Sequence, residues 1–517
     1  MVAAVSLGGP GGLGGLGGLG GLGGAASLDE VAAARFGIRA LRPAQRALME
    51  AVLAGKDAVG VLPTGSGKSL TYQLPALVLE KPVVVVSPLI ALMKDQRDHL
   101  ARARVDAAEL DSTLSKGEAR DVAREVRAGL HPIIYVTPER LRTPECIAML
   151  RARGVGLIAV DEAHCVSAWG HDFRPAYLGI AAAREALGSG ASGEGRVPML
   201  ALTATATEET VKEVVASLGM RAPRVVRGSV VREGLVFEVE RTVNEMAKRV
   251  ALVRLVEEES PKGGVGIVYA ATVKSADALF AWFTALRVPV AKYHAKMSPR
   301  AREASRAMFM NGTVRVMVAT KAFGMGIDKP DVRFVAHHQF PDSLESYVQE
   351  AGRAGRDGES ARCVLLYRLE DRRLQEFFLR QKTPSRRAVA AVLADAAGVG
   401  AAGAGAVRGG VAGIAERTGM SRRKVDAIVG HLAELGLVEV GEGAGADIAI
   451  ALRAGLASAD ALDAAVAADE ARRERAERRL DAMVHYAQRT DCRVRALAEY
   501  FGERGRAACG RCDACRR

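Results

Sequence analysis

The sequence is poor in aromatic residues and contains no long apolar run. Phe, Trp and Tyr make up 4% of the 517 residues, and only 2 residues are Trp. No stretch of about 18 apolar residues is free of charge or glycine, so we expect no membrane-spanning helix. The chain still has 49% hydrophobic and 26% charged residues, which is typical of a globular protein and excludes a largely disordered one.

Cysteine is also scarce and unevenly distributed. Three of the 7 Cys are scattered and four lie together near the C-terminal end: Cys146, Cys165 and Cys363, then Cys492, Cys509, Cys512 and Cys515. This pattern does not fit a secreted disulfide framework, so we expect a cytoplasmic protein. The Gly-Gly-Leu repeat between Gly8 and Gly24 has no Lys or Arg before it, which argues against a secretion signal and predicts a flexible tail over 1–26.

Acidic residues are outnumbered by basic ones. There are 72 Lys and Arg against 60 Asp and Glu, which gives a net charge of +12. This excess favours an acidic partner such as nucleic acid or an anionic membrane. Arg-rich and Ala-rich proteins are often basic without such a partner, so charge alone leaves the question open.

Short apolar runs alternate with longer amphipathic stretches between residues 30 and 370. The runs that we expect to be buried strands form two series: 57–62, 83–87, 133–137, 157–162 and 199–205, then 266–270, 314–320 and 333–339. Such alternation predicts parallel sheets covered by helices, and therefore two consecutive α/β lobes. We expect the stretch 221–235 to be the linker between them.

The composition changes again after residue 384. Residues 413–440 predict a helix, a turn at Gly419-Met420, a second helix and a strand, followed by a further turn and strand. This order is that of a helix-turn-helix with a wing. Its second helix begins with Arg422, Arg423 and Lys424, which suit phosphate contacts and equally suit a solvent-exposed charged face. Residues 464–517 predict a long Arg-rich helix and then the cysteine cluster.

The segment PTGSGKS, residues 63–69, follows an expected strand and opens an expected helix. Its glycines let backbone N–H groups surround phosphates, Lys68 can reach the β- and γ-phosphates, and Ser69 can bind Mg²⁺. The candidate nucleotide contacts are Thr64, Gly65, Ser66, Gly67, Lys68 and Ser69. The strict eight-residue pattern requires glycine where this chain has Leu62, so the segment alone also fits a bare turn.

Two further segments suit phosphoryl transfer. LIAVDEAH, residues 157–164, is an apolar strand ending in Asp161, which would hold Mg²⁺ through water, and Glu162, which would position or deprotonate the attacking water. The alternative is a capping pair at a helix start. In QEAGRAGRDG, residues 349–358, Arg353 and Arg356 are expected on one face of a helix, where they can stabilise a transferring phosphoryl group or form a solvated basic face.

Taken together, these segments resemble the RecQ family of DEAH-type superfamily 2 helicases over roughly residues 30–380. The other segments that carry the resemblance are LRPAQ (41–45), SPLIALMKDQ (87–96), TPERL (137–141), LTATAT (202–207), VYAAT (268–272), YHAKM (293–297) and VATKAFGMGIDKPDVR (318–333). The resemblance implies that Arg42 and Gln45 read adenine, that Asp328 lies at the nucleotide, and that ATP and Mg²⁺ are used. It also implies DNA contacts for residues 87–96 and 137–141.

One of the two tryptophans, Trp169, lies with Phe173 and Tyr177 in CVSAWGHDFRPAY, residues 165–177, which resembles the aromatic-rich loop of that family. There the loop senses single-stranded DNA and reports it to the ATP site. Bases stack on aromatic faces with about 1–3 kcal/mol each, so we expect Trp169, Phe173 and Arg174 to bind DNA, with His171 as a link. The alternative, that the aromatics belong to the core, is weaker because the stretch has neither helical nor strand periodicity.

The four clustered cysteines have the spacing of a zinc site. Four thiolates suit tetrahedral Zn²⁺ and leave no open position, so the metal would be structural. The stretch from Cys492 to Cys515 also resembles the RecQ zinc subdomain. In the usual order of that family, a winged helix follows the zinc subdomain, whereas here the helix-turn-helix comes before it, and we expect no further C-terminal helical domain.

We therefore expect two tandem RecA-like P-loop lobes, a winged-helix-like module and a small zinc-binding helical module. The boundaries are 1–26 for the tail, 27–222 and 223–382 for the lobes, 383–460 for the winged helix and 461–517 for the zinc module. The expected function is an ATP-dependent DNA helicase acting in repair or recombination, with 3′ to 5′ direction implied by the resemblance. The alternatives are a translocase that does not separate strands and a DNA-binding regulator switched by ATP.

The same interpretation sets expectations for partners and location. We expect the protein to bind single-stranded DNA and duplex junctions, with single-strand-binding or repair proteins as candidate partners. We expect no membrane association, a monomer, and a cytoplasmic location at the nucleoid.

Overall fold

The computed structural model describes residues 27–111, 113–167, 174–188, 196–259, 263–324, 327, 329–382, 385–400, 410–434, 437–442, 448–452 and 459–517. The chain forms two units that divide after Arg42. In the first unit, α1 (Leu28–Phe36) begins at Ser27, whose hydroxyl accepts a hydrogen bond from the backbone N–H of Glu30. It ends at Gly37, whose φ of 66° is the left-handed conformation typical of helix ends. The expected tail, 1–26, lies outside the described residues.

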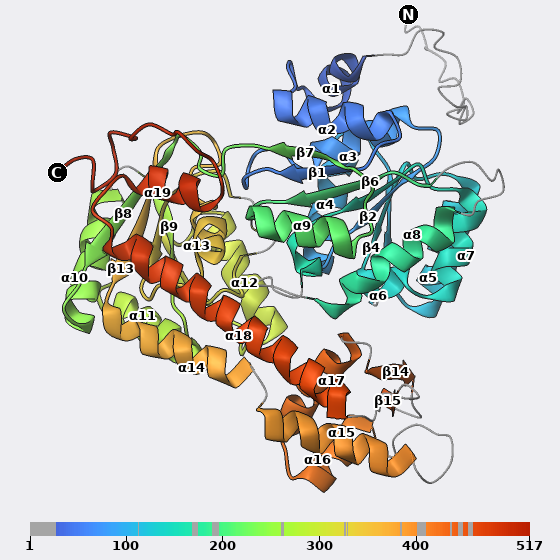
Figure 1. Ribbon diagram of the computed structural model, residues 1–517. Helices are drawn as coiled ribbons and strands as arrows, with labels where there is room; N and C mark the ends of the chain where they lie inside the picture. The colour runs from blue at the N-terminus through green and yellow to red at the C-terminus, as the bar shows by residue number, and fades with distance from the viewer. Residues whose placement is uncertain are drawn as a thin grey trace, which may run out of the picture. The chain divides into compact units, whose positions relative to one another are not determined.

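A parallel sheet forms the core of the first lobe, in the order β3-β4-β2-β5-β6-β1-β7 (Figure 1). Its strands are β1 (Ala58–Val61), β2 (Val83–Val86), β3 (Ala107–Leu110), β4 (Ile133–Val136), β5 (Leu157–Val160), β6 (Met199–Thr203) and β7 (Arg224–Arg227). Its helices are α2 (Pro43–Leu53), α3 (Leu70–Val78), α4 (Ile90–Arg102), α5 (Lys116–Ala128), α6 (Pro138–Leu141), α7 (Pro144–Arg153), α8 (Ile180–Gly188) and α9 (Glu208–Ser217), with the 3₁₀ turns η1 (Ala163–Val166) and η2 (Pro175–Gly179). The five inner strands are buried along their whole length, as expected when helices cover both faces of a parallel sheet.

The second lobe is built on another parallel sheet, in the order β10-β11-β9-β12-β13-β8. Its strands are β8 (Leu235–Arg241), β9 (Val265–Tyr269), β10 (Val290–Tyr293), β11 (Val316–Ala319), β12 (Val332–His337) and β13 (Ala361–Tyr367). Its helices are α10 (Glu245–Glu259), α11 (Val273–Ala285), α12 (Pro299–Met310), α13 (Leu344–Ala351) and α14 (Arg372–Lys382), with the 3₁₀ turn η4 (Leu369–Asp371). The two expected α/β lobes are thus confirmed.

The expected linker, 221–235, is wrong in part. Within it, β7 pairs in parallel with β1 and forms the edge of the first sheet, with Ala58 opposite Arg224. The sheet of the first lobe therefore extends past residue 222, and the connection between the lobes is 228–234. Strand β7 has the sequence RVVR and is mostly exposed. It pairs with one strand only, and such an edge strand tolerates charged, exposed side chains. Its sequence therefore resembles that of a linker.

The segment after α14 forms a helix-turn-helix with a hairpin wing, as expected. Its elements are α15 (Arg386–Gly400), α16 (Gly410–Thr418), α17 (Arg422–Glu434) and the antiparallel strands β14 (Val438–Glu442) and β15 (Ile448–Leu452). Their apolar side chains form a separate small core around Val389, Ile414 and Ile428. Arg422 and Lys424 are exposed.

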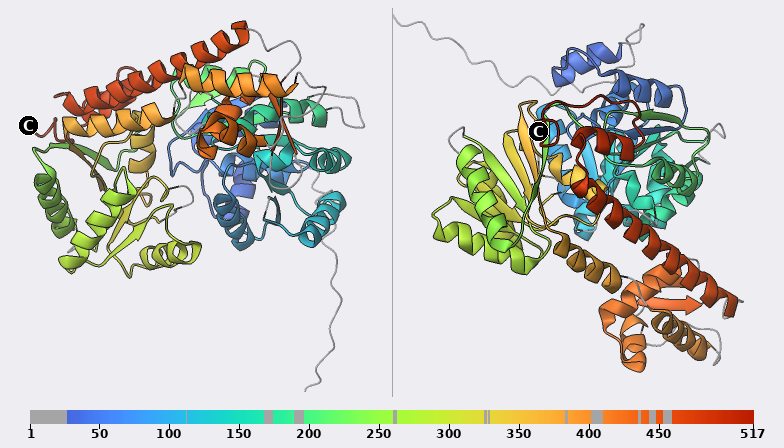
Figure 2. Two further views of the ribbon diagram at one scale, coloured as in Figure 1. Left: turned by 90° about the horizontal axis from the view of Figure 1, so that it is seen from below. Right: turned by 60° about the vertical axis from the view of Figure 1, so that its left-hand side comes forward.

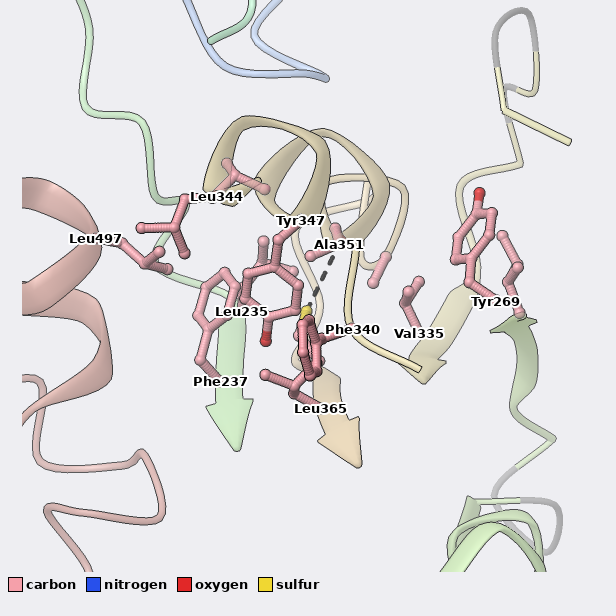
Figure 3. Close-up of a cluster of buried hydrophobic side chains, with 14 of the residues drawn as sticks. Leu235, Phe237, Tyr269, Val335, Phe340, Leu344, Tyr347, Ala351, Leu365 and Leu497 are labelled. Carbon is pink, nitrogen blue, oxygen red and sulfur yellow. Dashed lines mark hydrogen bonds between the residues drawn. The ribbon is translucent and has the colours of Figure 1, made fainter. Parts of the chain in front are cut away.

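The chain ends in α18 (Ala459–Gln488) and α19 (Arg493–Tyr500), which pack on the second lobe (Figures 1 and 2). Tyr486 of α18 lies with its ring centroid 5.6 Å from that of Tyr347 on α13, which in turn is 5.9 Å from that of Phe237 on β8. Leu497 of α19 approaches the same cluster (Figure 3). The second lobe and the C-terminal helices therefore share one hydrophobic core. No helix within the described ranges is long and apolar enough to cross a membrane.

The edge strand β3 carries a buried carboxyl group that should make stability depend on pH. Glu109 is 5% exposed, and burial together with the Asp111 carboxyl raises its pKa to about 7 despite Arg97 at 3.2 Å. An unfolded chain has a Glu pKa of about 4.3, so the stability due to the protonated group is complete below that value and is lost as the pH rises toward 7. Replacement of Glu109 by Gln is therefore expected to stabilise the protein by about 1 kcal/mol or more near pH 8, and hardly at all near pH 4.

Thermal unfolding of the wild type and Glu109→Gln at the two pH values measures this difference. Equal shifts at both values would show that the substitution acts through packing and not through proton binding.

Candidate nucleotide site and zinc centre

Three loops of the first lobe meet at one edge of its sheet. The neighbouring strands β5, β6 and β1 are parallel, so their carboxyl ends lie side by side. They lead into residues 161–162, 204–207 and 62–69 respectively. The carboxyl edge of a parallel sheet is where α/β proteins of this kind bind ligands.

The phosphate-loop segment has the backbone form that its glycines allow. Gly65 and Gly67 have φ of 78° and 74°, a region that side chains with a Cβ rarely adopt. Gln45, at the start of α2, donates from Nε2 to the carbonyls of Ser66 at 3.0 Å and Gly67 at 3.1 Å. Lys68 donates from Nζ to the carbonyl of Leu62 at 3.2 Å, so its ammonium group lies over the loop.

The two carboxylates after β5 are held differently. Asp161 is 8% exposed, and burial, followed by the charge of Glu162, raises its pKa to about 7. Glu162 has a φ of 47°, which is unusual for a residue with a side chain and is often found at functional sites. Its carboxylate lies 3.4 Å from His164, whose Nδ1 is 3.0 Å from the hydroxyl of Thr203 at the end of β6. The acid pair is therefore part of the same network as the neighbouring strand.

The two arginines of the second lobe do not share a helix face, and that expectation is wrong. Helix α13 ends at Ala351, and the turn that follows contains Gly352 and Gly355, the latter with a φ of 54°. Arg353 is 6% exposed and donates to the carbonyl of Gly324 inside its own lobe.

Arg356 lies at the phosphate loop instead. A Cβ on Gly65 would be 3.7 Å from Cγ of Arg356. Burial lowers the pKa of Lys68, and the charge of Arg356 lowers it further against the opposing charges of Glu162 and Asp161. Arg353 is thus buried within the second lobe, whereas Arg356 lies beside the phosphate loop of the first lobe.

Arg232, in the connection between the lobes, is a site residue that the sequence did not reveal. Its guanidinium donates to the carbonyls of Gly352 and Gly355, each at 2.8 Å, and to that of Ala354. Its Nη1 would be 3.4 Å from a Cβ on Gly65. Arg232 therefore holds the turn that carries Arg356 beside the phosphate loop, and nothing in the surrounding sequence distinguishes it from other basic residues.

Five of the expected site residues lie outside the unit that carries the phosphate loop or outside the described residues. Trp169, His171, Phe173 and Asp328 lie outside the described residues. Arg42 belongs to the N-terminal unit.

Arg174 belongs to the aromatic segment, residues 165–177, and is among the described residues. Its backbone N–H donates to the carbonyl of Cys165 at 2.9 Å, and its Nη1 donates to the carbonyl of Pro88 at 2.7 Å. Arg174 thus links back to Cys165 within the aromatic segment, and it joins this segment to Pro88, which lies shortly before α4.

The four clustered cysteines come together at the C-terminal end. The Sγ atoms of Cys492, Cys509, Cys512 and Cys515 all lie within 4.8 Å of one another. Backbone N–H groups point at two of them: that of Cys509 at Sγ of Cys492 (3.2 Å), and that of Arg493 at Sγ of Cys512 (3.4 Å). Such N–H groups favour thiolates, and four thiolates at these separations fit a tetrahedral zinc ion. The other three cysteines are buried and apart, as expected.

Two facing parallel-sheet lobes, with a phosphate loop and an acid pair on one and an arginine from the other beside that loop, define the class of two-lobed helicase-type ATPases. Family models agree: DEAD/DEAH box helicase matches residues 42–214, Helicase conserved C-terminal domain matches 247–358, and RecQ zinc-binding matches 453–516. The chain is 40% identical over 349 residues to the ATP-dependent DNA helicase RecQ of Bacillus subtilis, covering 67% of this chain and 57% of that protein. It is 37% identical over 360 residues to the probable ATP-dependent DNA helicase RecS of the same organism, covering 69% and 70%.

The chain belongs to the RecQ family. Its match spans a little over half the length of several relatives, as it does for the B. subtilis RecQ protein. Among solved structures, Mycobacterium smegmatis helicase Lhr bound to single-stranded DNA and AMP-PNP has the same fold, with a TM-score of 0.54 at 20% identity over 87% of this chain and 62% of that one.

Proposed function

We propose that the protein is an ATP-dependent DNA helicase that moves 3′ to 5′ on single-stranded DNA and separates duplex strands, in repair or recombination. The observation that carries this proposal is the position of Arg356, which the second lobe presents beside Gly65 of the phosphate loop. An arginine from one lobe at the phosphate site of the other makes ATP turnover depend on the distance between the lobes. Turnover can therefore be linked to stepwise movement along a strand.

The residues divide the work of hydrolysis. Lys68 binds the β- and γ-phosphates, Glu162 orients the attacking water and accepts its proton, and Arg356 stabilises the charge that develops on the transferring group. Ser69 and Asp161 offer the oxygen ligands that Mg²⁺ prefers, and the buried Asp161 carboxyl fits such a cation because the ion would offset the cost of burying its charge. Bound there, Mg²⁺ would neutralise phosphate charge.

DNA would be sensed by the aromatic segment, with Trp169 and Phe173 stacking on bases. Arg174 supports this proposal, because it joins the end of that segment to Pro88, in a stretch for which the family resemblance implies DNA contact. His164 and Ser167 connect the other end to the acid pair: the N–H of Ser167 donates to the carbonyl of His164 at 3.2 Å. A base that displaces the segment can thereby change the position of Glu162.

Steady-state ATP hydrolysis with no nucleic acid, single-stranded DNA, duplex or RNA tests the proposal. We expect single-stranded DNA to stimulate the wild type by about tenfold or more, and Trp169→Ala to lose most of that stimulation. Lys68→Ala should be inactive throughout. Trp282→Phe is the matched control, because Trp282 is the other tryptophan of the chain and lies on α11 of the second lobe, against Phe283.

The outcomes separate the candidate functions. Stimulation by single-stranded DNA together with unwinding of forked DNA supports a helicase. Stimulation without unwinding would favour a translocase, and equal rates with and without DNA would favour a DNA-binding regulator switched by ATP.

A further inference from the structure

Helix α18 connects three parts of the molecule (Figures 1 and 2). Its first turns pack on α15 of the winged-helix segment, where Asp463 pairs with Arg386 at 2.6 Å. Its last turns place Leu480 and Met483 in the core of the second lobe. Between these ends, Arg475 points at the first lobe.

Arg475 forms an ion pair with a helix of the first lobe. Its Nη1 is 2.8 Å from Oε1 of Glu213 and 3.5 Å from Oε1 of Glu209, both on α9. The side chains of Arg475 and Glu213 are 30% and 20% exposed. This contact crosses from a helix anchored in the second lobe to one anchored in the first, so any movement between the lobes must act on it.

The other oxygen of the Glu213 carboxylate holds the start of the aromatic segment. Oε2 of Glu213 accepts a hydrogen bond from the hydroxyl of Ser167, which is 1% exposed. Ser167 directly precedes the residues 168–173 and follows η1, which begins after Glu162. One carboxylate therefore bridges α18 and the segment that links the acid pair to the aromatics.

Open space borders the pair. A cavity of about 440 Å³ is lined by Glu213, Arg475 and polar or charged neighbours, among them Glu345, Arg479 and Tyr500. A charged contact beside a polar cavity can lengthen or reorient without leaving an apolar void, whereas a packed apolar contact cannot. The geometry suits a contact that changes during a cycle.

We propose that Glu213 and Arg475 are positioning residues that transmit DNA engagement at the aromatic segment to α18, and through α18 to the second lobe. The inference deepens the proposed function and rests on it. One carboxylate oxygen of Glu213 accepts the hydrogen bond from Ser167, so a movement of Ser167 displaces Glu213. The ion pair with Arg475 then displaces α18, whose last turns lie in the core beside α13. Arg475 reaches the acid pair only through Glu213 and Ser167, so we expect turnover without DNA to depend little on Arg475.

The test compares wild type, Arg475→Ala, Arg475→Lys, Glu213→Gln and the double variant in ATP hydrolysis, with and without single-stranded DNA. Arg473→Ala is the matched control, because Arg473 lies on the same helix and pairs with Glu477 of that helix at 2.8 Å. We expect Arg475→Ala to keep the wild-type rate without DNA and to lower the DNA-stimulated rate by about fivefold or more. Arg475→Lys should recover part of the loss, and the double variant should be no worse than Arg475→Ala.

Two measurements distinguish transmission from a merely structural role. The thermal unfolding midpoint of Arg475→Ala should stay near that of Arg473→Ala, because partly exposed ion pairs contribute little to stability. DNA affinity should change little, while the maximal stimulation falls.

Two results would overturn the inference. One is stimulation of Arg475→Ala that equals that of Arg473→Ala in a protein whose wild type responds to DNA, which would leave the proposed function intact. The other is a wild type that does not respond to single-stranded DNA, which would overturn the proposed function and this inference together.

Discussion

Replacing Arg356 by Ala is expected to lower kcat for ATP hydrolysis by about 10³-fold, with little change in nucleotide affinity. The reason is that Arg356 reaches the phosphate loop from the second lobe, near Gly65 and Lys68. An arginine in this place acts on charge that develops during transfer, more than on the bound substrate. Steady-state hydrolysis combined with titration of a fluorescent ATP analogue measures both quantities.

Arg353→Ala is the contrasting variant. Arg353 is buried and donates to the carbonyl of Gly324, so its removal leaves that carbonyl without this donor. We expect a loss of stability of about 1–3 kcal/mol, visible as a lower thermal unfolding midpoint, before any effect on chemistry. If Arg353→Ala lowered kcat as much as Arg356→Ala at unchanged stability, the division of roles between the two arginines would be wrong.

Disrupting the cysteine cluster is expected to abolish ATP hydrolysis indirectly, through the helices that pack beside α13. Structural zinc contributes about 10–16 kcal/mol to the folding of small zinc peptides, so Cys512→Ser or strong chelation should unfold the region around α19. Cys512 and Leu497 lie in the same core as Tyr347 of α13, the helix that leads into the turn carrying Arg356. ATP turnover should therefore fall together with zinc content, although the cluster takes no part in hydrolysis. Metal analysis, limited proteolysis and hydrolysis rates on the same samples check this.

Cys146→Ser provides the matched control. Cys146 is 2% exposed, but it lies in the core of the first lobe, far along the chain from the cluster. Its replacement should keep the zinc content of the wild type. Full turnover in a zinc-free Cys512→Ser protein would show that the C-terminal helices do not support α13.

The parts of the fold that the sequence predicted are those with a strong local signal. Strands buried on both faces are continuous apolar runs, and the inner strands of the first sheet were all predicted from them. The sequence did not predict the edge strands, which are β3, β7, β8 and β10. An edge strand tolerates charged and polar side chains between its apolar ones, so it does not form the continuous apolar run that marks an inner strand. The inner strand β13 was missed as well, although it is nearly all buried.

The site shows the same limit in another form. Lys68, Asp161 and the four cysteines could be named because short segments carry their chemistry. Arg232 and Glu213 could not, because their roles come from partners more than 40 residues away in the chain, at Gly352, Gly355 and Ser167. The sequence predicted a helix here because Arg353 and Arg356 have helical spacing, whereas Gly352 before them and Gly355 between them allow the chain to leave the helix.

Helices α14 and α18 form an antiparallel stem with the winged-helix segment at its tip. Near the second lobe, Arg372 of α14 pairs with Asp481 of α18 at 2.7 Å, and at the far end Asp463 of α18 pairs with Arg386 of α15, the first helix of the tip, at 2.6 Å. The chain thus leaves the body of the molecule and returns to it along the same path. An arrangement of this kind behaves as a self-contained insertion: because α14 and α18 pack on each other and the tip has its own small core, a change in the tip can leave the contact of the stem with the second lobe intact.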